Sequence, residues 1–193
     1  KRISQGFTPE GIQETTGKSQ RVLRKLIHLE KPVIAAVNGD AVGMGFNLAL
    51  ATDFVIASEE ARFSEIFVRL GIIPDFGGLY FLPRLVGLAK SKELVYLGGM
   101  IPAKEAKEMG IVYKVVPPEE LEREALEFAR RLAGMPTLAI GKAKGIINRA
   151  LNMTLDEILE EEVKTQAFLS KTEDHQEGIR AILEKRRPKF QGK

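Results

Sequence analysis

Any catalysis by this 193-residue chain must use carboxylates, lysines or backbone groups. The sequence has no Cys, which excludes disulfides, thiolate nucleophiles and Cys-ligated metal sites, and its two His leave almost nothing for a histidine metal site or triad. Asp75 is the strongest candidate base, because it lies in IPDFGG, where apolar neighbours would partly desolvate it and raise its pKa. A competing interpretation makes Asp75 a cap of the helix that follows.

A glycine turn is the second feature that could do chemistry. The segment VIAAVNGDAVGMGFNLALATD predicts a buried strand that turns through Gly43 and Gly45 into a helix. Free N–H groups at the start of that helix would stabilise a developing negative charge, as an oxyanion hole does. Two alternatives stay open: a dinucleotide-binding turn, weakened because Leu48 stands where a third glycine is needed, and glycines that serve only the turn.

Other candidate side chains are weaker. Glu65 lies near the predicted pocket, but its place on a strand favours a side chain that faces away. His28, at the end of a helix, and His175, in KTEDHQEG, are typical of surface positions. A basic run that begins at Lys185 is typical of solvated surface, and the alternative is a contact with a phosphate-bearing ligand.

The elements that would position these residues alternate between strands and helices as far as residue 117. Beyond Pro117 and Pro118 only helices are expected, and Thr154 and Glu157 form a capping-box pattern at the start of one of them. This order predicts an α/β core, residues 1–134, followed by a helical region, residues 135–193. We expect a loop over 1–17, strands over 32–37, 53–57, 62–66 and 111–116, and helices over 18–29, 43–52, 79–87, 90–98, 103–109, 119–134, 137–151, 154–170 and 174–186.

Composition excludes several classes of protein. The net charge of +3 is too small and too mixed to indicate nucleic-acid binding. No run of 18 apolar residues and no leader peptide is visible, so a cytoplasmic protein is expected. Because Lys1 opens directly into the polar stretch KRISQGFTPEG, we interpret the chain as a piece of a longer protein.

The long block KPVIAAVNGDAVGMGFNLALATDFVIASEEARFSEIFVRLGIIPDFGGLYFLPRLVG resembles the enoyl-CoA hydratase/isomerase (crotonase) superfamily, and AKEAKEMGIVYKVVP and EKRRPKF extend the resemblance over essentially the whole chain. It looks most like the ring-epoxide isomerase subgroup of phenylacetate breakdown. The resemblance implies an α/β spiral of ββα turns, a C-terminal helical trimerisation region, and a homotrimer or hexamer. It also implies an acyl-CoA thioester substrate whose coenzyme A is the only cofactor-like group, with no metal.

Carried over by position, the resemblance assigns one backbone oxyanion donor to Met44, whereas the second donor would lie upstream of Lys1. It assigns Lys185 a contact with the adenine and phosphate of coenzyme A. The two glutamates that hydratases use as acid and base correspond to Asn47 and Phe67, and neither can act as a base. Further substrate-binding positions implied in this way are Ala41, Gly43, Gly45, Asn47, Phe67 and Gly77.

Asp75 then remains as the base, as in isomerases of this superfamily. The favoured activity is an isomerase that shifts a double bond or isomerises a ring epoxide through an enolate. The alternatives are an enoyl-CoA hydratase of fatty-acid β-oxidation and a non-catalytic acyl-CoA-binding subunit, with a Rossmann dehydrogenase a distant further choice.

Overall fold

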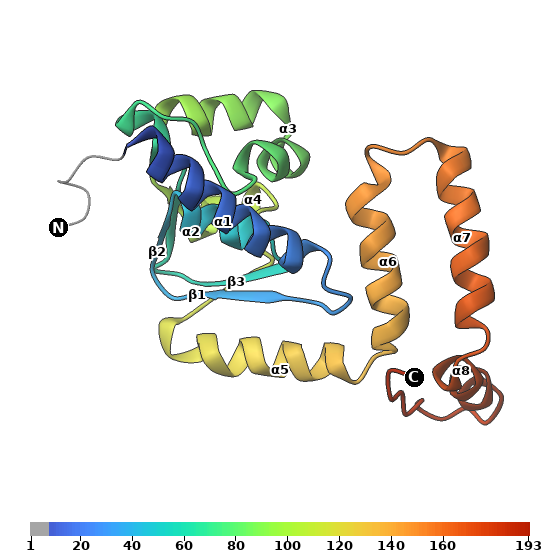
Figure 1. Ribbon diagram of the computed structural model, residues 1–193. Coiled ribbons are helices and arrows are strands. Elements are labelled where there is room, and N and C mark those ends of the chain that lie inside the picture. The colour runs from blue at the N-terminus through green and yellow to red at the C-terminus, as the bar shows by residue number, and fades with distance from the viewer. Residues whose placement is uncertain (1–7) are drawn as a thin grey trace. The chain divides into compact units, whose positions relative to one another are not determined.

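The computed structural model describes residues 8–193, which divide into two compact units (Figure 1). The first unit contains residues 8–27 and 33–125, and the second contains residues 28–32 and 126–193. The predicted division into an α/β core and an oligomerisation region after residue 134 stays a prediction, because it concerns assembly as well as contacts.

The loop predicted over residues 1–17 was wrong for residues 9–17, which are helical. Residues 1–7 of the predicted loop lie outside the described residues. Helix α1 spans Pro9–Ile27, nine residues longer at its start than the predicted helix over 18–29. Thr8 caps this helix, since its hydroxyl accepts a hydrogen bond from the Gly11 N–H at 3.1 Å. Pro9 follows the cap at the first helical position, where a missing N–H costs nothing.

Two small sheets build the first unit. Strands β1 (Ile34–Val37), β3 (Phe54–Ser58) and β6 (Lys114–Val116) form a parallel sheet in the order β1-β3-β6. Strands β2 (Asp40–Val42), β4 (Arg62–Ser64) and β5 (Ile101–Pro102) form the other sheet, in which β4 pairs parallel with β2 and antiparallel with β5. From β1 to β4 the strands alternate between the two sheets, β5 stays in the sheet of β4, and β6 returns to the sheet of β3, so the chain advances as a spiral of ββα turns.

The hydrophobic core of the first unit lies around β3 and the helix α2 (Met44–Leu50). Phe46 and Phe63 are fully buried with ring centroids 5.3 Å apart, and Leu82 of the helix α3 (Gly78–Leu97) is fully buried in the same cluster. Strand β3 is buried, as predicted. The same prediction was wrong for β1, because this strand lies at the edge of its sheet and exposes Ala36.

The remaining helices of the first unit follow from glycines and prolines in the sequence. Helix α3 (Gly78–Leu97) breaks at Gly87, whose φ of 76° and ψ of 167° separate the two helices predicted over 79–87 and 90–98. Helix α4 (Ala103–Glu108) ends before Gly110, which has the positive φ expected of a helix terminator. Short 3₁₀ helices are η2 (Ile66–Leu70) and η3 (Pro118–Glu120).

The second unit is helical, as predicted. It contains most of α5 (Leu121–Ala133), then α6 (Thr137–Ala150), α7 (Leu155–Leu169) and α8 (Glu173–Leu183). Thr154 and Glu157 form the predicted capping box at the start of α7. Helices α6 and α7 pack side by side (Figure 1), and Lys142 of α6 forms an ion pair with Glu30 at 2.7 Å.

Candidate active site

Met44 provides the backbone donor at the centre of the candidate site. It is the first residue of α2, so its N–H has no acceptor within the helix, and the residue is 50% exposed. Gly43 before it adopts φ 57° and ψ −122°, a conformation that side chains disfavour, and its N–H bonds the Ser64 carbonyl at 2.9 Å. The strand β4 therefore fixes the turn that presents Met44 N–H.

Phe67 closes one side of this turn. A Cβ atom placed on Gly43 would come 3.4 Å from the Phe67 ring, and Phe67 itself is buried on η2. A Cβ at that distance would make ordinary contact, so the positive φ of Gly43 is what requires a glycine here. An aromatic ring occupies the position at which the resemblance expects a hydratase carboxylate.

Asn47 links α2 to the loop that carries Asp75. Its side chain is fully buried one helical turn after Met44, and its Nδ2 donates a hydrogen bond to the Asp75 carbonyl oxygen at 2.9 Å. Helix α3 packs so closely there that a Cβ on Gly78 would lie 2.3 Å from Asn47 Oδ1. Asn47 therefore holds the Asp75 loop in place.

Asp75 is half-buried at the end of the loop before α3, and its Oδ1 atom is buried without a hydrogen-bond partner among residues 8–193. Burial raises the pKa of the Asp75 carboxyl, and its own backbone N–H opposes the rise. The helix-cap interpretation was wrong: α3 is capped by Gly77 in the left-handed region, and no side chain bonds its first turn. The carboxylate is therefore available for proton transfer.

Glu65 also belongs to this cluster, although the sequence analysis favoured a side chain facing away. It follows β4 directly, is fully buried, and neither carboxyl oxygen has a hydrogen-bond partner within the described chain. Burial raises the pKa of Glu65 to about 7; the nearby Asn47 side chain opposes this and the Asp75 charge adds to it. The sequence showed an acidic residue next to a strand near the predicted pocket. It could not show that the Glu65 side chain points inward, because that direction depends on tertiary packing.

The other implied positions lie in both units. Ala41 is buried in β2, and Gly77 has φ 81° with no room for a side chain, because a Cβ would come 2.7 Å from Phe81. Gly45 is exposed in the first turn of α2. Lys185 is exposed after α8 in the second unit, where its φ is 52°. The structure brings Met44, Asn47, Phe67 and Asp75 into one neighbourhood; the binding role of each stays a prediction.

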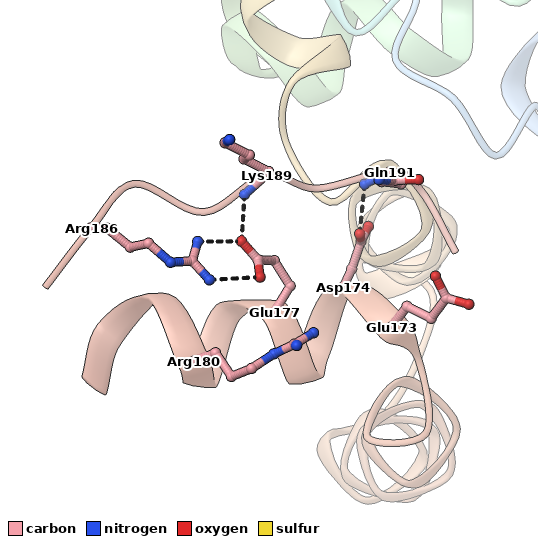
Figure 2. A pocket seen from close by; sticks show the side chains of 7 residues that line it. All are labelled: Glu173, Asp174, Glu177, Arg180, Arg186, Lys189 and Gln191. Atoms are coloured by element: carbon pink, nitrogen blue, oxygen red, sulfur yellow. Dashed lines mark hydrogen bonds and ion pairs between the residues drawn. The ribbon is translucent and has the colours of Figure 1, made fainter. Parts of the chain in front are cut away.

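A hollow in the second unit lies apart from this chemistry (Figure 2). Its acidic groups are already engaged: Glu177 accepts two hydrogen bonds from Arg186, at 2.6 and 2.9 Å, and Asp174 accepts one from the Gln191 N–H at 2.6 Å. The ion pair with Arg186 lowers the pKa of Glu177 to about 2. This hollow is where the C-terminal segment is fastened to α8, and Arg186 of the basic run serves that contact.

Residues 8–193 lack two other features: a metal-binding cluster and a membrane-spanning helix. They contain no group of three or more His, Cys, Asp or Glu arranged to hold a metal ion. None of their helices is long and apolar enough to cross a membrane. His28 and His175 are exposed, as predicted.

Comparison with known proteins now identifies the family. The enoyl-CoA hydratase/isomerase family model matches residues 4–193. The chain is 44% identical to the 1,2-epoxyphenylacetyl-CoA isomerase of Escherichia coli K12 over 89% of its own length, and 42% identical to the crotonyl-CoA hydratase of Syntrophomonas wolfei over 96%. It spans 66% of the first relative and 72% of the second.

A solved structure agrees. The enoyl-CoA hydratase/isomerase of Cupriavidus metallidurans CH34 superposes with a TM-score of 0.91 at 37% identity, over 99% of this chain and 72% of that one. The chain therefore belongs to the enoyl-CoA hydratase/isomerase family, and the predicted crotonase-like fold with its C-terminal helices is confirmed. The relatives carry names of both isomerases and hydratases.

Proposed function

We propose that this protein isomerises an unsaturated acyl-CoA or a related ring epoxide, with Asp75 as the base. The observation that carries the proposal is the half-buried Asp75 carboxyl, whose raised pKa and unpartnered Oδ1 suit it to accept a proton. Asn47 and Phe67 supply no carboxylate to activate water. The similarity to an epoxyphenylacetyl-CoA isomerase supports the same choice.

In the double-bond shift, the thioester oxygen of a 3-enoyl-CoA accepts a hydrogen bond from Met44 N–H. Asp75 removes a proton from the carbon next to the thioester, and the electron pair of that C–H bond passes into an enolate whose oxygen carries the negative charge. The proton then returns from Asp75 to the far carbon of the former double bond. The double bond ends in conjugation with the thioester, and the Asp75 carboxylate is restored.

A hydratase is the second candidate. The 42% identity to a crotonyl-CoA hydratase favours it, and Glu65 is a further buried carboxyl near Asp75. Hydration would need one carboxyl group to hold and deprotonate water, in a site where Phe67 removes the usual partner. A non-catalytic acyl-CoA-binding subunit is the alternative to both enzymes.

The test uses Asp75→Asn, which keeps the shape of the side chain and removes its basicity. Isomerisation, and exchange of acyl hydrogens in D₂O followed by NMR, should both fall by roughly 10²–10⁴-fold. The exposed Asp156→Asn is the matched control. Loss of crotonyl-CoA absorbance measures hydration in the same samples: fast hydration that survives Asp75→Asn would refute the isomerase, and a parent inactive in both assays would favour the binding subunit.

Other parts of the proposal concern binding and assembly. Lys185 would contact a phosphate of coenzyme A, and no metal, flavin or nicotinamide would take part in the reaction. Ala41, Gly43, Gly45 and Gly77 would line the acyl thioester. We place this activity in a cytoplasmic homotrimer or hexamer.

A further inference from the structure

The buried cluster around Asp75 has more hydrogen-bond acceptors than donors. Four buried side-chain oxygens lack a partner among the described residues: both carboxyl oxygens of Glu65, Oδ1 of Asn47 and Oδ1 of Asp75. One N–H of the Asn47 amide is already used, because Nδ2 donates to the Asp75 carbonyl oxygen at 2.9 Å, and the second N–H, which lowers the pKa of Glu65, can serve only one of the four oxygens. A buried acceptor without a donor destabilises the folded protein. The cluster as it stands therefore needs a further donor.

Among the residues that the structure describes, no cation is placed to meet this need. Asp75 is the one ionisable group, within residues 8–193, whose charge acts on Glu65. Charged residues on the elements packed around Glu65 are exposed or engaged elsewhere: Arg62 pairs with Asp40, Arg84 bonds the Tyr80 carbonyl, and Lys90 pairs with Glu93, while Arg69, Lys104, Glu105 and Lys107 are exposed. A proton on one of the two carboxyl groups would supply such a donor.

We propose that Glu65 is a positioning residue that stays protonated in the working protein and donates a hydrogen bond to the Asn47 amide oxygen, which holds Asn47, and through it the Asp75 loop, in place. This proposal rests on the proposed function, in which Asp75 is the base. Glu65 is the better holder of the proton because it is fully buried, whereas Asp75 is half-buried and must be ionised to act. The pKa of about 7 that burial gives Glu65 agrees with this assignment.

Ionisation of Glu65 would remove the donor and set two buried carboxylates against each other. The pair titrates as a unit, so below the upper apparent pKa it holds one proton and one negative charge. Above that pKa the repulsion would displace the Asp75 side chain, and small misplacements of a catalytic group are costly. The turnover number, kcat, should therefore fall as the pH rises through about 7.

The experiment combines a titration with a pH profile. In the parent protein labelled with ¹³C at the glutamate carboxyls, one NMR signal should titrate near pH 7; it should be absent in Glu65→Gln and should move to lower pH in Asp75→Asn, which removes the neighbouring charge. Glu65→Gln keeps a donor that does not titrate. Its isomerase kcat should match the parent below pH 6 and stay flat where the parent loses roughly tenfold by pH 9.

The outcomes separate the two proposals. If every glutamate carboxyl of the parent titrates below pH 6, Glu65 is not the donor and the inference fails, even where Asp75→Asn is inactive. If Asp75→Asn keeps full activity, the proposed function fails, and the titration still decides where the proton lies. A parent kcat that rises through pH 7, with Glu65→Gln flat, would mean that ionised Glu65 strengthens the base, which overturns the positioning role. The titration of the parent needs no variant to fold.

Discussion

Single residues decide which chemistry this member of the family can perform. Asn47 replaces a potential base with an amide, yet the amide fastens the loop that carries Asp75. Phe67 replaces the other carboxylate with a ring that packs against the Gly43 turn. Both residues therefore contribute to the structure of the site, and neither provides a carboxylate at these positions. Glu65 adds a buried acidic group whose cost to stability depends on pH.

Burial of Glu65 should make the free energy of unfolding depend on pH. Folding raises the pKa of Glu65 from 4.5 to about 7, so between these values the folded protein keeps a proton that the unfolded chain has lost. Stability should therefore fall as the pH rises through this window, by on the order of 3 kcal/mol in total. Glu65→Gln should lack this decline and gain on the parent by that amount between pH 4.5 and 8. Urea unfolding followed by circular dichroism measures it, with the exposed Glu59→Gln as control; equal slopes in parent and Glu65→Gln would contradict it.

At the scale of elements, the sequence predicted most helices and strands because glycines and prolines mark their ends. Gly87 separates two helical stretches, and Gly110 ends α4, as the pattern indicates. The start of α1 was missed because the polar stretch with Gly6, Pro9 and Gly11 suggested a loop, whereas Thr8 and Pro9 are a typical cap and first residue. The orientation of Glu65 could not be predicted, because it depends on how η2, α2 and α3 pack in three dimensions.

Two glycines of comparable helices test that packing. In α3, a methyl group on Gly78 would lie 2.3 Å from Asn47 Oδ1, so Gly78→Ala should displace Asn47 from the Asp75 carbonyl and destabilise the protein by about 1–3 kcal/mol. In α6, a Cβ atom added at Gly145 would meet nothing within 4 Å. Gly145→Ala should therefore stabilise the folded protein by up to about 1 kcal/mol through helix propensity. Urea midpoints compare the two variants. A stabilising Gly78→Ala would mean that Asn47 moves away without loss.

The whole molecule leaves a large apolar surface uncovered in the second unit. Ile147 and Leu151 at the end of α6, with Leu155 and Val163 of α7, are each at least 70% exposed. Full burial of such a side chain stabilises a protein or an interface by about 1.5–3 kcal/mol. A single chain does not gain this free energy, because these side chains are exposed. Exposed apolar side chains in this number indicate a surface that another protein covers, and a second copy of the chain fits the proposed trimer.

The test of assembly is a charge placed in that surface. Leu151→Glu would bury an unpaired carboxylate in any interface formed there, so it should convert the proposed trimer or hexamer into monomers at micromolar concentration. Lys171→Gln is the control, because it changes the net charge by the same amount at an exposed site in the turn before α8. Size-exclusion chromatography with light scattering gives the mass of each. A parent that is already monomeric would contradict the predicted assembly, and a Leu151→Glu variant that keeps the parent's oligomeric mass would place the interface elsewhere on the protein.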